Sequence, residues 1–350
     1  MRKFFISLLL LLLVGGGVAA YFGYTMFYGP AVADDFTVRI TPRTEYESVL
    51  DKVKANSKYN WAFEFYADYL DLKSALRVGT FRIERDMSVM TIVRTLKYGE
   101  SVTLRLTINK ARTPEALAKK IAAKTNISEE DMLKTLRDST LIAELGFDSA
   151  EAMFSIFLPN TYELMCDVTP RDLVLKLKAE SDKYWSSSKR KEQLERLGFT
   201  PLQAMTMASI VHEETNAESE MARIAGVYVN RLKKDMLLQA DPTVKYALND
   251  PSVKRILKRH LKIDSPYNTY KHKGLPPTPI AMPDLVAIEA VLNYEEHDYL
   301  YFCARPEFDG KHNFAETLEE HEKNAKAYHD ALDEWQRKKK EGMQPQQTNK

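Results

Sequence analysis

Cysteine is scarce in this sequence, with 2 residues in a chain of 350. So few cysteines exclude a disulfide-dense scaffold and a structural zinc site built from cysteine ligands. An excess of charge is absent as well, since 50 Lys and Arg residues balance 49 Asp and Glu residues. Because phosphate binding needs a basic excess or a basic face, we predict no nucleic-acid partner.

Charged side chains are also missing from one long stretch near the N-terminus. No Asp, Glu, Lys, Arg or His occurs between Lys3 and Asp34. Residues 4–28 are long and apolar enough to cross a bilayer core of about 30 Å, which requires about 20 apolar residues. Aromatic residues gather at the far end of this stretch, as in the belt that marks a membrane interface. They are Tyr21, Phe22, Tyr24, Phe27 and Tyr28.

A cleaved signal peptide is the alternative interpretation of this stretch. Ala31-Val32-Ala33 resembles a small-residue cleavage site, but the apolar region is longer than a usual signal-peptide core. We therefore expect an uncleaved transmembrane helix, with residues 1–3 held in the cytoplasm by Arg2 and Lys3. In a bacterium, this predicts a single-pass protein of the inner (cytoplasmic) membrane whose remaining part is periplasmic.

The residues after this stretch predict an α+β fold. Residues 36–108 are expected to form a small α+β module without a catalytic pattern, which suits a binding role. Its expected elements are strands at 36–40, 78–84 and 102–108 and helices at 44–56, 61–70 and 88–98. Residues 109–335 are expected to form a mainly helical domain, with one long helix from Thr169 to about Leu197. Residues 341–350 are predicted to be a flexible tail.

One helix carries the clearest chemical signal. Thr200 before Pro201 is typical of a helix start, and apolar residues surround most of the helix that follows, so we expect it to be buried. Two adjacent carboxylates end this helix. Glu214 continues an apolar stripe, whereas Glu213 continues a more polar one. The two side chains are therefore expected to have different surroundings.

A carboxyl group on an apolar stripe loses its water, which raises its pKa. Such an acid can protonate a glycosidic oxygen near neutral pH, so Glu214 is a candidate general acid. The alternative is that Glu213 and Glu214 lie at a frayed helix end and point to water. His212 and Glu213 begin the zinc motif H-E-x-x-H, but residue 216 is Asn. We therefore expect a helix-end hydrogen bond from His212 and predict no metal site and no cofactor.

Three polar clusters follow this helix. Glu220 lies in the first turn of a helix predicted over 218–232, and Asp241 before Pro242 resembles a helix N-cap. Residues 265–280 are expected to form a long loop, whose aromatic and amide groups suit stacking on sugar faces and bonding to N-acetyl groups. Asp241 is interpreted as a cap, a site residue or both, and the loop is alternatively only a rigid turn.

Five motifs occur in an order that resembles the endolytic murein transglycosylase family known as MltG, or YceG-like. They lie at residues 208–215, 229–232, 238–243, 267–270 and 274–280. Residues 78–82 resemble the LysM-like module of that family, and residues 157–162 resemble another of its landmarks. The active-site Glu of the family ends a segment usually written A-S-I-V/I-E-K-E-T, and Glu214 matches it. His212 departs from the pattern, which puts in doubt a shared role for that position.

The resemblance implies a membrane-anchored lytic transglycosylase that cleaves the MurNAc–GlcNAc bond within peptidoglycan glycan strands. Glu214 would act first as acid and then as base, and the C6 hydroxyl of the sugar would close a 1,6-anhydro-MurNAc end. The candidates for contacting the glycan are Glu220, Gln239, Asp241, Tyr267, Asn268 and Tyr270. The family also suggests cell-wall synthases as partners.

Two other functions remain open. One is a muramidase, which hydrolyses the same bond and needs a second carboxylate such as Asp241 or Glu220. The other is a non-catalytic peptidoglycan-binding module. In an oxidising compartment, Cys166 and Cys303 either pair or remain two small buried residues.

Overall fold

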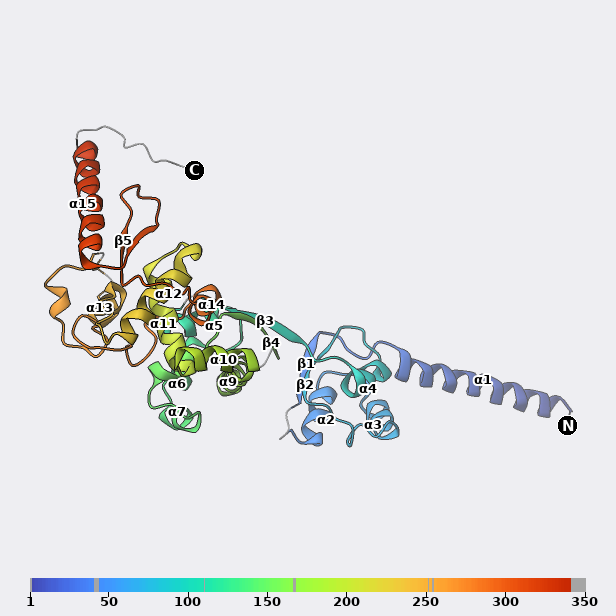
Figure 1. Cartoon of the computed structure of the whole chain (residues 1–350). Helices are drawn as coiled ribbons and strands as arrows, with labels where there is room; N and C mark the ends of the chain where they lie inside the picture. Colours follow the sequence, from blue (N-terminus) through green and yellow to red (C-terminus); the bar gives the residue numbers. More distant parts are fainter. Residues whose placement is uncertain are drawn as a thin grey trace. The chain divides into compact units, whose positions relative to one another are not determined.

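The computed structural model describes residues 2–40, 44–109, 111–165, 168–250, 252–253 and 255–340. It divides into two compact units, one of Met1–Leu106 with Glu163–Val168 and one of Thr107–Tyr162 with Thr169–Lys350 (Figure 1). The boundary between the units runs through a pair of strands, β3 (Thr103–Ile108) and β4 (Asn160–Met165). Helices and short strands are mixed in the chain, as the sequence predicts. Cys166 and the predicted tail at 341–350 lie outside the described residues.

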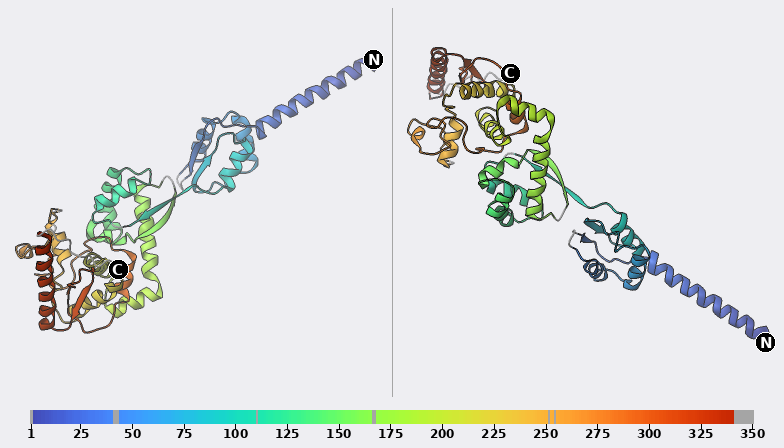
Figure 2. Two further views of the ribbon diagram at one scale, coloured as in Figure 1. Left: turned by 90° about the horizontal axis from the view of Figure 1, so that it is seen from above. Right: turned by 60° about the horizontal axis from the view of Figure 1, so that its bottom comes forward.

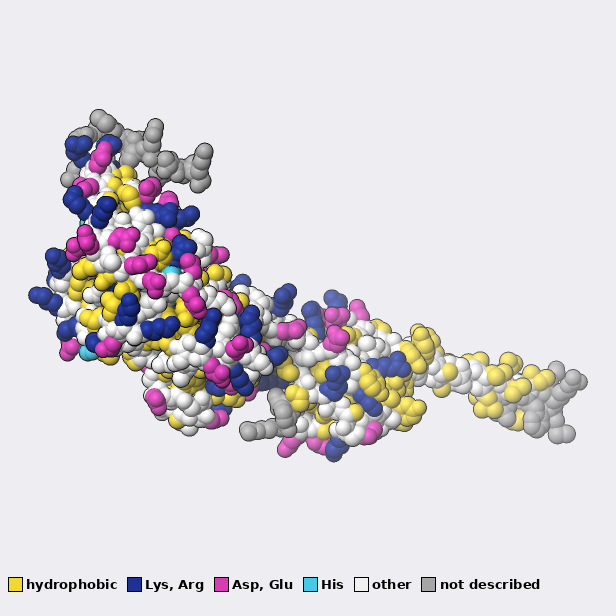
Figure 3. Space-filling model, viewed as in Figure 1, with side chains coloured by type: hydrophobic (Ala, Val, Ile, Leu, Met, Phe, Trp, Pro, Cys, Tyr) yellow, Lys and Arg dark blue, Asp and Glu magenta, His cyan; other side chains and the backbone are white. Residues whose placement is uncertain are grey.

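The first unit begins with a single long helix, α1 (Arg2–Tyr28), which runs unbroken in every view (Figures 1 and 2). Its segment Leu9–Tyr28 spans 20 residues and is apolar enough to cross a membrane. None of this segment is buried against protein, and apolar side chains recur along it in Figure 3. By length and composition, α1 qualifies as a membrane anchor or as a signal sequence.

The rest of the first unit is a small α+β module. Strands β1 (Phe36–Ile40) and β2 (Gly79–Ile83) pair antiparallel. The helices are α2 (Tyr46–Lys54), α3 (Asn60–Tyr69) and α4 (Val89–Tyr98). Alternate residues of β1 point into the core, and Ser88 caps α4 by accepting a hydrogen bond from the backbone N–H of Thr91 at 3.2 Å. These elements confirm the predicted strands at 36–40 and 78–84 and the three predicted helices to within two residues. The strand predicted at 102–108 is β3, which pairs with β4 and not with the sheet of this module.

The segment directly after α1 is part of the core of this module. Ala31 and Val32 are 0% and 2% exposed. An isolated bridge pairs Pro30 with Ser88, and another pairs Val32 with Ser57. The residues that resemble a cleavage site are therefore held by the fold of the module that follows them.

The second unit is mainly helical. Its elements are α5 (Pro114–Ala122), α6 (Glu129–Leu136), α7 (Ser139–Glu144), α8 (Ala150–Met153), η1 (Phe154–Ile156), α9 (Pro170–Ser186), α10 (Ser188–Leu197), α11 (Pro201–Glu214), α12 (Glu218–Lys233), α13 (Asp241–Leu248), η2 (His260–Lys262), α14 (Leu285–Leu292), β5 (Tyr301–Ala304), β6 (His312–Ala315) and α15 (Leu318–Lys340). Strands β5 and β6 pair antiparallel, and α15 packs against both. Cys303 in β5 is a free, half-buried cysteine, and burial raises the pKa of its thiol.

The long helix predicted from Thr169 to Leu197 is wrong, because the chain contains two helices there. The backbone of Ser187 is extended, with φ −64° and ψ 145°, and separates α9 from α10. Ser186 and Ser187 donate their hydroxyls to the carbonyls of Lys183 and Tyr184. Serine side chains that bond to nearby carbonyls compete with helix formation, and three consecutive serines make this the weakest point of the segment.

Helix α11 forms the centre of the second unit. Thr200 and Gln203 make a reciprocal capping box at its start. Every residue from Ala204 to Val211 is buried, which confirms the prediction of a buried helix. Helices α12 and α14 both pack against it.

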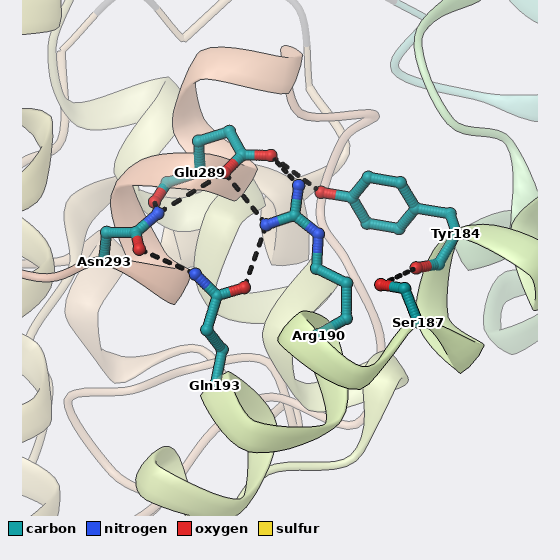
Figure 4. A network of polar contacts seen from close by, with 6 residues as sticks. All are labelled: Tyr184, Ser187, Arg190, Gln193, Glu289 and Asn293. Atoms are coloured by element: carbon teal, nitrogen blue, oxygen red, sulfur yellow. Dashed lines mark hydrogen bonds and ion pairs between the residues drawn. The ribbon is translucent and has the colours of Figure 1, made fainter.

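A polar network joins α10 to α14 (Figure 4). Arg190 donates two hydrogen bonds to the carboxylate of Glu289, and Tyr184 donates a third at 3.1 Å. Gln193 donates to Asn293 Oδ1 at 2.6 Å. Burial opposes ionisation of Glu289, but the hydrogen bonds and charge of Arg190 hold its pKa below the usual value. The network therefore fixes α14, which in turn supports α11.

Candidate functional site

Glu214, the last residue of α11, is half-buried. Its Oε1 accepts a hydrogen bond of 2.6 Å from the hydroxyl of Tyr228. Burial raises the pKa of Glu214 to about 7, and the negative charge of Asp241 adds to the rise. The hydrogen bond from Tyr228 and the positive charge of Arg231 oppose it. This carboxyl group can therefore hold a proton near neutral pH and can also release it.

None of the described residues hydrogen-bonds to Oε2 of Glu214. The two oxygens of the carboxyl group are thus distinguished by the protein. Oε1 accepts the hydrogen bond from Tyr228, whereas Oε2 has no hydrogen-bond partner in the described part of the chain.

Tyr228 and Arg231 were not among the residues predicted from the sequence. Both lie on α12 and are almost fully buried. Tyr228 packs edge-on against Phe302 at 5.9 Å, and burial raises the pKa of its hydroxyl above the usual value. The position of Tyr228 on the apolar stripe of a helix could have identified it from the sequence. A tyrosine buried in this way requires a hydrogen-bond partner for its hydroxyl.

Arg231 holds the surrounding backbone together. Its Nε donates to the carbonyl of Leu300 at 2.6 Å, and its Nη1 donates to that of Leu238 at 2.9 Å. Its guanidinium also lies over the ring of Tyr301, at 5.2 Å from the centroid. Burial lowers the pKa of Arg231. The residue therefore connects α12 to the segment before Asp241 and to the strand β5.

Glu213 has different surroundings from Glu214, as the two stripes predict. Arg112 donates to it from Nε at 3.2 Å and from Nη2 at 2.6 Å. Arg112 is itself largely exposed. The pair borders a hollow of about 270 Å³. Its lining residues are Arg112, Thr113, Glu213, Pro242, Lys245, Tyr246, Asn249, Asp250 and Ile280.

The predicted helix-end hydrogen bond of His212 is not found at its Nδ1. This atom is buried and lacks a hydrogen-bond partner among the described residues. Its nearest carboxylate oxygen, Oδ2 of Asp284, is 3.6 Å away, which exceeds hydrogen-bond distance. Within the described ranges, no three His, Cys, Asp or Glu side chains are grouped so that they could hold a metal ion.

The prediction that Asp241 caps a helix is wrong. Helix α13 has Ala240 at its N-cap, and no side chain caps it. Asp241 instead accepts a hydrogen bond of 2.7 Å from the hydroxyl of Tyr270. Burial raises the pKa of Tyr270, and its hydrogen bond to Asp241 adds to the rise. Asp241 remains exposed, so its second oxygen is open to an external group.

Two buried threonines attach the loop at 267–270 to the segment at 239–243. Thr269 Oγ1 accepts a hydrogen bond of 2.9 Å from the backbone N–H of Ala240 and lies 2.8 Å from Thr243 Oγ1. The backbone N–H of Gln239 donates to the carbonyl of Thr269 at 3.1 Å. Gln239 has a positive φ of 53° and an exposed side chain. The predicted polar clusters around Gln239 and Tyr270 are therefore side by side in the fold.

Tyr267 and Asn268 differ in their access to the surface. Tyr267 is half-buried, and its hydroxyl lies 2.6 Å from Thr278 Oγ1 in the Pro-rich part of the loop. Asn268 is 0% exposed, and its amide donates to the carbonyls of Leu261 and Ile263 at 2.9 and 2.8 Å. In this structure, Asn268 shapes the loop from inside and presents no surface to a glycan.

Glu220 is also engaged inside the protein. It is 4% exposed and accepts hydrogen bonds from the backbone N–H of His312, at 3.1 and 3.2 Å. The His312 ring Nδ1 lies 3.0 Å from the same carboxylate. Glu220 therefore holds the β5–β6 hairpin to α12 and is not exposed to a substrate in this structure.

The comparisons with known proteins agree with these motifs. Residues 38–327 match the model of the YceG-like family. A relative from Bacillus subtilis (strain 168), named endolytic murein transglycosylase, is 30% identical over 308 residues, which cover 83% of this chain and 84% of that protein. A relative of the same name from Streptococcus pneumoniae serotype 2 (strain D39 / NCTC 7466) is 29% identical over 300 residues, which cover 76% of this chain and 53% of that protein.

A solved structure is similar over much of the chain as well. The crystal structure of a YceG-like protein from Listeria monocytogenes has 29% sequence identity and a TM-score of 0.53, and the match covers 83% of this chain and 98% of that one. The family model alone covers most of the described residues. This chain therefore belongs to the YceG-like family.

Proposed function

We propose that this protein is an endolytic peptidoglycan lytic transglycosylase that uses Glu214 as its general acid and base. The observation that carries the proposal is the carboxyl group of Glu214, whose pKa of about 7 follows from burial. In the family motif that residues 208–215 resemble, the active-site Glu stands at the position of Glu214. Relatives named endolytic murein transglycosylase support peptidoglycan as the substrate.

The reaction begins with proton transfer from Oε2 of Glu214 to the oxygen that links MurNAc to GlcNAc. The bond between that oxygen and C1 of MurNAc then breaks and leaves a cation-like sugar. The C6 hydroxyl of the same sugar attacks C1, and its proton passes to the Glu214 carboxylate. The acid is restored, a 1,6-anhydro-MurNAc end forms, and no water is consumed.

Tyr228 and Asp241 have complementary roles in this cycle. The Tyr228 hydroxyl stabilises the carboxylate that Glu214 becomes after the first proton transfer. The charge of Asp241 favours the protonated acid beforehand and favours a positive charge on the sugar nearby. A ring closure within the substrate also benefits from proximity, so one essential acid–base residue is enough.

The glycan is expected to contact the exposed and half-buried members of the predicted set. These are Gln239, Asp241, Tyr267 and Tyr270. Asn268 and Glu220 act as positioning residues, because each is buried and bound to backbone groups. A muramidase would use Asp241 as the second carboxylate, since Glu220 is not accessible.

We further propose that α1 is an uncleaved anchor in the inner membrane, with the remainder outside the cytoplasm. Cleavage after Ala33 would remove Ala31 and Val32 from the core of the module and break the bridges of Pro30 and Val32. The module at 36–108 is assigned a LysM-like role in binding peptidoglycan. Cell-wall synthases are the partners that the family resemblance suggests.

The test uses the full-length protein in detergent micelles with purified peptidoglycan. Mass spectrometry of the released fragments is expected to find anhydro-ended glycans with the wild type and none with Glu214→Gln. Glu218→Gln is the matched control, because Glu218 is an exposed carboxylate at the start of α12. Reducing MurNAc ends would instead establish a muramidase. Equal cleavage by Glu214→Gln would remove Glu214 from the mechanism.

A further inference from the structure

Helix α3 exposes a row of aromatic side chains that the core of its module does not use. Trp61, Phe65 and Tyr69 are 66%, 53% and 73% exposed. Their spacing of four residues places them on one face of the helix, and the rings of Trp61 and Phe65 stack at 5.6 Å. The opposite face of α3 is buried in the core. We call these three residues the aromatic face.

The aromatic face continues directly from the end of α1. The ring of Phe27, one residue before the end of that helix, lies 6.4 Å from Trp61 and 5.9 Å from Phe65. Tyr24 and Tyr28 stack at 5.0 Å and are largely exposed. In Figure 3, apolar side chains gather where α1 meets its module. The aromatic side chains of two elements therefore form one surface within the first unit.

The chemistry of this surface suits the boundary between lipid and water. Tryptophan and tyrosine concentrate at the headgroup level of membranes, where an apolar ring and a polar atom are both satisfied. The segment of α1 that is long enough to span a bilayer ends at Tyr28, so Phe27 falls at the same level. Asp68 lies exposed beside Tyr69, which fits a headgroup region and not the hydrocarbon core. A contiguous apolar patch on a protein surface marks a site of contact with a membrane or another molecule.

We propose that the aromatic face of α3 lies in the outer interfacial layer of the membrane that α1 crosses. The first unit would then rest on the bilayer through α1 and α3 together, so that its orientation to the membrane is fixed. The proposal relies on the proposed anchoring role of α1. A glycan strand stacked on the same rings is the competing occupant, and the experiment below separates the two.

The test measures tryptophan fluorescence of the full-length protein in phosphatidylcholine–phosphatidylglycerol vesicles. Vesicles with brominated acyl chains are compared with unbrominated ones, because bromine quenches only nearby tryptophans. A quenched component in the wild type that disappears in Trp61→Phe supports the proposal, since the other tryptophans, Trp185 and Trp335, belong to the second unit. A matched control places a tryptophan at exposed Lys52 of α2 in the Trp61→Phe protein. It is expected to remain unquenched.

Three results would overturn the proposal, and each has a separate meaning. Flotation with the vesicles without quenching of Trp61 would leave the anchor intact and place the aromatic face in water. Failure to float would refute the anchor as well. A change in Trp61 fluorescence on addition of soluble glycan strands, without bromine quenching, would assign the face to the glycan. None of these results depends on the transglycosylase activity.

Discussion

The two sides of the end of α11 offer contrasting surroundings to adjacent carboxylates. Glu213 pairs with an exposed guanidinium at the edge of a hollow. Glu214 is half-buried, receives the Tyr228 hydroxyl and has a pKa raised to about 7. One residue along a helix turns the side chain by about 100°. Here the turn separates a carboxylate that pairs with an exposed arginine from an acid that receives a tyrosine hydroxyl. Surroundings, and not residue type, give a carboxyl group the properties of a general acid.

The largest expected effect tests this contrast directly. Glu214→Gln should lower the rate of glycan cleavage by about 1,000-fold, because a general acid contributes about 10²–10⁴ to a rate. Glu213→Gln should lower it by less than about 10-fold, since it loses an ion pair with an arginine whose side chain is 65% exposed. Initial rates of fragment release measure both. Equal losses from the two variants would contradict the contrast.

The second prediction concerns stability, because removal of the Glu214 carboxyl group should stabilise the protein at alkaline pH. The rise of the Glu214 pKa from 4.5 to about 7 means that the folded state holds a proton that the unfolded state releases. This acid therefore destabilises the protein progressively as the pH rises from about 4.5 through 7, by up to about 3 kcal/mol. Glu214→Gln should thus raise the thermal midpoint at pH 8 and have little such effect at pH 4.5.

Thermal unfolding of the full chain in detergent, followed by tryptophan fluorescence, measures this difference at both pH values. Glu218→Gln is the control, because its carboxylate is exposed. A midpoint change in Glu214→Gln that is independent of pH would show that the carboxyl group has an ordinary pKa.

A smaller effect is expected from Tyr228→Phe. The lost hydroxyl removes a hydrogen bond that favours the ionised form of Glu214, so the pKa of the acid should rise further. Activity should fall about 10- to 100-fold, as expected for a hydrogen bond to a charged group worth about 1.5–3 kcal/mol. The pH at which activity declines on the alkaline side should move upward. The pH profile of the cleavage rate tests this, and a downward shift would mean that Tyr228 acts on the acid in another way.

Much of this contrast was visible in the sequence. The apolar period of α11 predicted both its burial and the separation of Glu213 from Glu214, because helix geometry fixes which residues share a face. The strands and helices of the first module followed in the same way from alternation and from caps such as Ser88. These features depend on local spacing alone.

The partners of the site residues depend on contacts between segments that are distant in the sequence. Nothing near Glu214 in the sequence indicates that Tyr228 would reach it, or that Arg112 would pair with Glu213 from 101 residues away. The predicted cap at Asp241 is wrong because the helix already begins at this residue, and its carboxylate accepts the hydroxyl of Tyr270 instead. Glu220 and Asn268 had the right residue types for a glycan site, yet burial against backbone groups occupies them. Local patterns do not reveal such competition between partners.

The smallest expected effect concerns Glu289, whose pKa is shifted in the opposite direction to that of Glu214. Glu289 has a lowered pKa, since the hydrogen bonds and charge of Arg190 outweigh burial. Its contribution to stability is present above the unfolded pKa and is lost as the pH falls through the lower, folded value. Glu289→Gln should destabilise the chain by about 0.5–1 kcal/mol at pH 7, a value limited by its partial exposure, and by less at pH 3. Asp182→Asn, which removes the exposed pair with Lys178, should change the thermal midpoint less. Stabilisation by Glu289→Gln at pH 7 would contradict this prediction. The network of Figure 4 would then be a source of strain, and the attachment of α14 to α10 would not depend on the network.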